Sequence, residues 1–230
     1  MPQNNIIEEK KIAGEKAVEF IKENTIVGIG TGTTVYYAIK KIGAMIKEGL
    51  KIKCVSTSNE TTKMALSLNI PLISINEIDK IDLTIDGADE VDKNLNGIKG
   101  GGGALLFEKI VALNSKKTIW VVDSTKTVDK LGKIPLPVEI IPFGYKNLFE
   151  KFIVEKLNPV LRKNGDEICV TDAGHYIFDL HLDEIKDPLG LNNHLKSFTG
   201  IVETGLFINM ASSVIVGKGE KTEITERKKI

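Results

Sequence analysis

The chain has 230 residues, of which 42% are hydrophobic and 27% charged, a composition typical of a folded globular protein. Lys and Arg together number 31, as do Asp and Glu, so the chain lacks the positive field that non-specific nucleic-acid binding requires. The sequence opens on no apolar signal core, and no run approaches the roughly 18 apolar residues of a membrane span. We therefore expect a cytoplasmic protein without nucleic-acid or membrane partners.

The first half of the sequence alternates helical and strand-like patterns. Residues 6–24 carry apolar side chains at helical spacing. The apolar run 25–30 reads as a strand, and a glycine turn then leads into the second helical pattern, 31–49. The unit repeats with a strand-like run at 51–57 and a helical segment at 58–69, which ends before a proline.

Three further short apolar runs, at 71–75, 80–86 and 116–123, read as strands. Short apolar strands that alternate with helices are typical of a parallel sheet with helices on both faces. We therefore predict an α/β fold built on a Rossmann-like, mainly parallel sheet.

The pattern changes after residue 132, where three prolines occur close together. The order of elements that follows is strand, helix, strand, strand, helix and strand, which is typical of a split βαβ or ferredoxin-like unit. The predicted segments are 137–141, 146–161, 167–172, 176–182, 187–198 and 200–209. We predict a Rossmann-like catalytic domain of residues 1–132 plus 208–230, which a strand at 212–218 rejoins, and a smaller α+β domain of residues 133–207.

Three turn segments follow predicted strands of the first domain: "GTGTT" at 30–34, "DGADE" at 86–90 and "DSTK" at 123–126. Ligands bind outside the carboxyl ends of the strands in an open α/β sheet, so we expect a site where these segments meet.

The "GTGTT" segment lacks the last glycine of a dinucleotide fingerprint and the lysine of a P-loop. Its glycine turn and the hydroxyls of Thr31, Thr33 and Thr34 instead suit a single phosphate monoester at a helix N-terminus. The alternative is a helix cap that binds no ligand.

The segment from 86 to 103 combines acids, a lysine and bare backbone. Asp86 and Asp89 emerge from one tight turn, for which an Asx-type turn is the alternative explanation. Lys99 precedes four glycines, which cost conformational entropy unless the backbone must approach something closely. A flexible linker is the other interpretation, although a helical pattern follows directly.

Glu108 lies in that helical pattern, on the face shared with Ala104 and Val111. Helical side chains lean toward the N-terminus, so its carboxylate is expected to hang over the glycine loop. Its apolar neighbours favour a general base, because burial disfavours the charged form. A surface glutamate paired with a lysine is the alternative.

The cysteines and histidines carry no recognisable site. Cys54 and Cys169 lie in separate strand-like runs and are expected to be reduced thiols. His175, His181 and His194 lack the spacing of metal ligands. We expect no metal and no other cofactor.

Six segments resemble, in order along nearly the whole chain, those of the type A ribose-5-phosphate isomerase family: "GTGTT", "TIDGADEVD", "IKGGGGALLFEKIVA", "DSTK", "LGKIPLPVEIIP" and "GLFI". The resemblance implies a Rossmann-like domain with a small α+β domain used in oligomer contacts, and a homodimer or homotetramer. It implies an aldose-ketose isomerase that interconverts D-ribose 5-phosphate and D-ribulose 5-phosphate, a sugar phosphate pair of the pentose phosphate pathway, without a metal.

The family's site residues fall on matching positions of this chain. The resemblance implies a general base at Glu108 and a catalytic lysine at Lys99. The other implied residues are the phosphate and substrate loop Thr31, Gly32, Thr33 and Thr34, the acidic loop Asp86, Gly87, Ala88 and Asp89, the glycines Gly100, Gly101 and Gly102, and Lys126. Thr33 replaces the family's usual serine and keeps its hydroxyl, and "TDAGH" at 171–175 departs from a common T-D-N-G-N hairpin.

Two other functions are compatible with these residues. A transferase with a CoA-transferase-like fold would use Glu108 as a nucleophile, and hydroxylamine would trap its acyl-enzyme. A sugar-phosphate sensor would carry a DNA-reading segment, but the sequence contains no convincing helix-turn-helix or basic patch.

Overall fold

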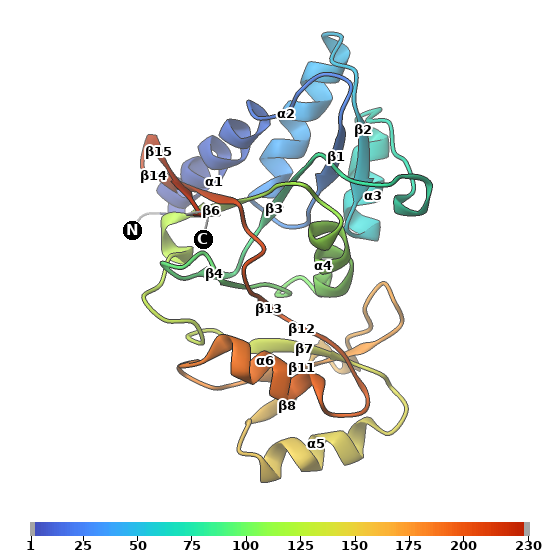
Figure 1. Cartoon of the computed structure of the whole chain (residues 1–230), viewed down its shortest axis with the longest axis vertical. Coiled ribbons are helices and arrows are strands. Elements are labelled where there is room, and N and C mark those ends of the chain that lie inside the picture. The colour runs from blue at the N-terminus through green and yellow to red at the C-terminus, as the bar shows by residue number, and fades with distance from the viewer. Residues whose placement is uncertain (1–2, 228–230) are drawn as a thin grey trace. The chain divides into compact units, whose positions relative to one another are not determined.

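A computed structural model describes residues 3–227 and divides the chain into two compact units (Figure 1). The first unit comprises Met1–Ala88, Phe107–Thr127 and Asn209–Ile230, and the second comprises Asp89–Leu106 and Val128–Ile208. Each unit has its own sheet and its own apolar core.

This division differs from the predicted boundary at residue 132, because residues 89–106 and 128–132 belong to the second unit. Backbone pairing explains the difference. The strand β5 (Gly97–Ile98) pairs with β13 (Leu206–Phe207), and the N–H groups of Gly132 and Ile134 donate to the Glu90 carboxylate.

The first unit contains a six-stranded sheet with the order β15-β14-β6-β3-β1-β2. All neighbouring pairs are parallel except β14 and β15, which confirms the predicted mainly parallel α/β sheet. The strands are β1 (Ile26–Ile29), β2 (Lys53–Ser56), β3 (Leu83–Gly87), β6 (Thr118–Asp123), β14 (Ser213–Lys218) and β15 (Lys221–Glu226).

Helices pack on both faces of this sheet, because successive strand residues point to opposite sides. Val27 and Ile29 of β1 join the apolar core that includes Ala13 and Ile39 from the helices. Gly28 faces the other way, where an added Cβ would lie 2.8 Å from Val111 of the fourth helix. The helices are α1 (Gln3–Val18) and α2 (Val35–Lys47), which lie side by side in Figure 1, α3 (Asn59–Ser67) and α4 (Leu105–Leu113).

A buried glutamate anchors α1 to the sheet. Glu9 is 2% exposed, and its Oε2 accepts hydrogen bonds from the N–H (3.0 Å) and hydroxyl (2.7 Å) of Ser124. Its Oε1 accepts the N–H of Gly219 at 2.9 Å, in the turn between β14 and β15. Burial alone would raise the pKa of the Glu9 carboxyl, but these hydrogen bonds outweigh it and hold the pKa below its ordinary value.

Glu9→Gln is expected to lower the free energy of unfolding by about 1–3 kcal/mol at neutral pH, because buried donors lose a charged acceptor. The contribution of a carboxyl with a depressed pKa is present above its unfolded pKa and is lost as the pH falls through its folded pKa. Urea unfolding at a series of pH values should therefore show the gap between wild type and variant closing in acid. The exposed neighbour Glu8 supplies the control, Glu8→Gln, and a gap independent of pH would contradict the assignment.

The second unit contains a four-stranded antiparallel sheet with the order β12-β7-β11-β8. Its strands and helices follow the predicted ferredoxin-like sequence of elements. They are β7 (Leu136–Ile140), α5 (Tyr145–Val154), β8 (Pro159–Leu161), β11 (Tyr176–Leu180), α6 (Pro188–Lys196) and β12 (Ile201–Thr204). The unit also holds the short strands β4 (Glu90–Val91), β5 and β13, and a hairpin of β9 (Lys163–Asn164) and β10 (Glu167–Ile168).

Three predicted elements are wrong in detail. The helix predicted at 146–161 ends at Val154, because Lys156 and Asn158 adopt left-handed backbone and Pro159 then begins β8. The strand predicted at 167–172 contributes only its first two residues, to the β9–β10 hairpin. The strand predicted at 71–75 is reduced to an isolated bridge between Leu72 and Cys54, and Ile75 already begins the short helix η1 (Ile75–Glu77).

Candidate active site

The three predicted site segments begin at the carboxyl ends of β1, β3 and β6 of the first unit, and the second segment continues into the second unit at Asp89. These strands are parallel neighbours, so their carboxyl ends lie at one edge of the sheet, as the sequence predicted. The first segment is tied directly to β3, since the N–H of Gly30 donates to the carbonyl of Ile85 at 2.9 Å.

Asp86 lies at the end of β3 and is 1% exposed. Its Oδ1 accepts the N–H of Gly87 at 2.7 Å and the N–H of Thr31 at 3.3 Å. Gly30 belongs to the predicted segment 30–34 but was given no role of its own, and an added Cβ there would lie 1.9 Å from this same oxygen. Only a glycine there lets the acidic segment and the threonine segment approach so closely.

The threonines of 31–34 differ in what their side chains do. The Thr31 hydroxyl lies 2.9, 2.8 and 3.1 Å from the hydroxyls of Thr57, Ser58 and Thr61, so it joins this loop to the start of α3. Thr34 is the N-cap of α2 but makes no side-chain capping hydrogen bond, which argues against the simple helix cap. Gly32 and Thr33 are exposed, and Gly32 has a φ of +118°. The loop therefore presents backbone and the Thr33 hydroxyl to solvent.

Glu108 lies in the first turn of α4 and is 4% exposed. The alternative that Glu108 is a surface residue is therefore wrong. Lys126 is half-buried in the short helix η2 (Ser124–Lys126), which Asp123 begins by accepting the N–H of Thr125 at 3.0 Å.

Lys99, Asp89 and the glycine loop belong to the second unit. The Lys99 side chain is 2% exposed, its N–H donates to the carbonyl of Gly205 at 2.9 Å, and its Nζ lies 5.3 Å from the centroid of the Phe207 ring. A buried lysine of this kind is uncommon unless its charge is used or paired.

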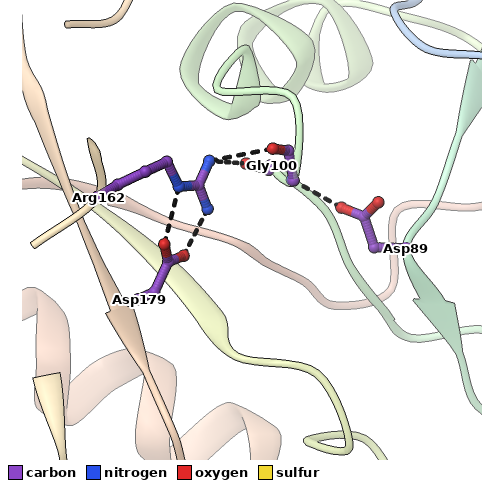
Figure 2. A network of polar contacts seen from close by, with 5 residues as sticks. Asp89, Gly100, Arg162 and Asp179 are labelled. Carbon is purple, nitrogen blue, oxygen red and sulfur yellow. Dashed lines mark hydrogen bonds and ion pairs between the residues drawn. The ribbon is translucent and has the colours of Figure 1, made fainter. Parts of the chain in front are cut away.

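The glycine loop is an ordered turn and not a flexible linker. Gly100 and Gly103 have φ values of +106° and +79°, and the N–H of Gly103 donates to the carbonyl of Gly100 at 3.0 Å. The N–H of Gly101 donates to Oδ2 of Asp89 at 2.8 Å (Figure 2). Left-handed backbone thus explains Gly100 and Gly103, and close approach to Asp89 explains Gly101.

Two further charged residues of the second unit are not among the predicted site residues. Glu90 is 2% exposed, and its carboxylate accepts the N–H of Gly132 at 2.7 Å and of Ile134 at 2.9 Å, so it is structural. Arg162, which sequence reasoning missed, contacts the carbonyls of Gly100 and Gly101. No motif spacing singled out this arginine.

The cysteines are both free, and burial raises the pKa of the Cys54 thiol to about 12, which makes it inert at neutral pH. Within residues 3–227, no cluster of three or more His, Cys, Asp or Glu side chains is arranged to hold a metal ion. Across the same range, no helix combines the length and apolar character needed to span a membrane.

Comparisons with known proteins identify the class of this fold and site. The family model for ribose 5-phosphate isomerase A (phosphoriboisomerase A) matches residues 53–221. Ribose-5-phosphate isomerase A of Enterococcus faecalis is 52% identical over 217 residues, which cover 93% of this chain and 96% of the relative. The protein of Lactiplantibacillus plantarum is 49% identical, over 94% of this chain and 96% of its own length.

Solved structures agree with this result. A D-ribose-5-phosphate isomerase in complex with phospho-erythronic acid superimposes with a TM-score of 0.93 at 39% identity, over 97% of this chain and 100% of that one. The chain is therefore an enzyme of the aldose-ketose isomerase class. It belongs to the ribose 5-phosphate isomerase A family.

Proposed function

We propose that this enzyme interconverts D-ribose 5-phosphate and D-ribulose 5-phosphate through a cis-enediolate, with Glu108 as the base. The observation that carries this proposal is the burial of Glu108, at 4% exposed, in the first turn of the helix that directly follows an ordered lysine and glycine loop. Burial disfavours the charged carboxylate, which makes it a stronger base once it is ionised.

Glu108 removes the proton from C2 of the open-chain aldose and returns it to C1. The C2 electron pair moves into the C1–C2 double bond, and the C1 carbonyl oxygen takes the negative charge. Within the enediolate the hydroxyl proton passes from O2 to O1, which moves the negative charge to O2. The O2 electron pair then forms the C2 carbonyl as the C1–C2 double-bond pair takes the proton back at C1. This leaves a hydroxyl at C1 and a ketone at C2, so the sugar undergoes no net oxidation. Positioned proton transfer of this kind contributes about 10²–10⁴-fold in rate.

Lys99 and the backbone of the glycine loop stabilise the charge that develops on oxygen. The relative solved with phospho-erythronic acid supports this role. The carboxylate of that ligand is planar and negatively charged, like an enediolate, and its other end carries a phosphate. A fixed ammonium and backbone dipoles suit such a group without a metal.

The remaining residues bind the substrate. Asp86 and Asp89 accept hydrogen bonds from the sugar hydroxyls, and one of them assists ring opening. Thr33, the backbone of 31–34 at the start of α2 and Lys126 hold the phosphate, since a helix N-terminus and a cation both favour an anion. Phosphate binding places C1 and C2 at the base.

A coupled assay for ribulose 5-phosphate formed from ribose 5-phosphate tests this function. We expect turnover in the presence of EDTA. In heavy water we expect deuterium incorporation at the carbon that receives the transferred proton. An acyl-enzyme trapped by hydroxylamine would instead indicate a transferase with Glu108 as nucleophile. Activity that EDTA removes and a divalent ion restores would overturn the metal-free mechanism.

A further inference from the structure

Arg162 contacts the glycine loop from the chain between β8 and β9 of the second unit. Its Nη1 donates to the carbonyl of Gly100 at 2.7 Å and to the carbonyl of Gly101 at 3.2 Å (Figure 2). The side chain is 15% exposed. An arginine that binds two successive carbonyls of the same loop fixes the orientation of both peptides.

Asp179 of β11 holds the guanidinium in place. The Nε of Arg162 donates to Oδ2 of Asp179 at 2.8 Å, and Nη2 pairs with Oδ1. A two-pronged pair of this kind fixes the plane of the guanidinium as well as its position. The backbone of Arg162 is also anchored, since its N–H donates to the carbonyl of Ile177 and its own carbonyl accepts the N–H of Cys169. The loop is therefore clamped to a regular sheet.

The clamp determines where the loop's N–H groups point. The peptides here are trans, so the C=O and N–H of one peptide point in opposite directions. In the first peptide, the Gly100 carbonyl meets Arg162 while the Gly101 N–H meets Asp89 on the opposite side (Figure 2). In the next, the Gly101 carbonyl meets Arg162, so the N–H of Gly102 is directed away from the arginine. Gly102 is exposed, which leaves this donor on the open side of the loop.

We propose that Arg162 is a positioning residue for the isomerase reaction, which orients the Gly102 N–H and the adjoining Lys99 toward the charge of the enediolate. This inference rests on the proposed function. The arginine acts through the loop and does not touch the substrate. Its loss therefore weakens an interaction made chiefly in the transition state, which lowers kcat more than it raises KM.

The experiment compares Arg162→Met, Asp179→Asn and Lys196→Met in the full-length protein. Lys196 is the matched control, because its Nζ also binds a carboxylate, Glu203 at 2.8 Å, and a backbone carbonyl, Val202 at 3.1 Å, but ties α6 to β12. We measure kcat, KM, the inhibition constant of phospho-erythronic acid and the melting temperature.

For Arg162→Met we expect kcat to fall about 10- to 100-fold, the cost of a small misplacement of catalytic groups, with KM changed less. The inhibition constant of phospho-erythronic acid should rise as kcat falls. Asp179→Asn should show the same pattern more weakly. The guanidinium of Arg162 still binds the two glycine carbonyls but loses its two-pronged pair with the carboxylate. Lys196→Met should keep the wild-type kcat.

Wild-type kcat in a folded Arg162→Met protein would overturn the inference and leave the proposed function standing. Inactive wild-type protein would overturn the proposed function and the inference together. If Arg162→Met does not fold, Arg162→Lys replaces it, because one ammonium cannot reach Asp179 and both carbonyls. We then expect kcat to fall about 10-fold with little change in melting temperature, and an unchanged kcat contradicts the inference.

Discussion

Glu108→Gln is expected to lower kcat by about 10²–10⁴-fold, because the amide cannot accept the C2 proton. KM should change little, since the amide fills the same space as the carboxylate. Deuterium incorporation from heavy water should fall in parallel with turnover. Both are measured by the coupled assay and by NMR of the sugar phosphates. A folded variant that retains most of its turnover would show that another group is the base.

Glu90→Gln is the matched control for this variant. Glu90 is also a buried glutamate, at 2% exposed, but its carboxylate holds the N–H groups of Gly132 and Ile134. We expect this change to lower the melting temperature more than it lowers kcat. The pair of variants thus separates the chemistry of Glu108 from the general effect of altering a buried carboxylate.

Lys99→Met should reduce kcat by about 10²–10³-fold, the usual loss when one stabilising group of an oxyanion is removed. The loss of kcat should be larger than any loss of folded protein, because the Lys99 charge acts on the developing oxyanion. The Lys99 side chain is 2% exposed, and loss of a buried charged group also changes stability. The coupled assay and thermal unfolding measure the two effects separately.

Lys93→Met controls for the loss of a lysine in the same segment, because Lys93 is exposed. It should leave both activity and melting temperature near wild type. If Lys99→Met instead lost stability and activity together while its residual kcat followed the folded fraction, Lys99 would be a structural lysine.

The sequence predicted the parallel sheet and its ligand edge because those features are written in local patterns. The strands β1, β3 and β6 are apolar runs, and each ends in a segment of glycine, acid or hydroxyl residues. The sheet and its ligand edge needed only strand and helix periodicity, together with the rule that parallel strands end at one edge. The helical pattern alone left Glu108 open between a buried base and a surface glutamate, and its combination with Lys99 and the glycines favoured the base.

Features that depend on tertiary contacts were not predictable in the same way. The apolar residues of 159–161 continue the helical spacing of α5, and this spacing outweighed the turn signal of Asn158 and Pro159 in the sequence prediction. The strand β15 is polar because it lies at the edge of the sheet, and only its pairing with β14 defines it. Arg162 acts through partners at Gly100 and Asp179, which no sequence spacing connects. Gly30 did have a signal, since it alternates with Gly28 where the backbone is crowded.

The position of β14 between β6 and β15 has a consequence for synthesis of the chain. β14 pairs with β6 along its length, yet residues 124–212 must be made between these two strands. Translation proceeds at about 5–20 residues per second, so the edge of β6 that later pairs with β14 stays unpaired for about 5–20 s on the ribosome. An unpaired edge of this kind is a template for aggregation. This edge of the sheet is therefore exposed to aggregation from the synthesis of β6 until β14 is made.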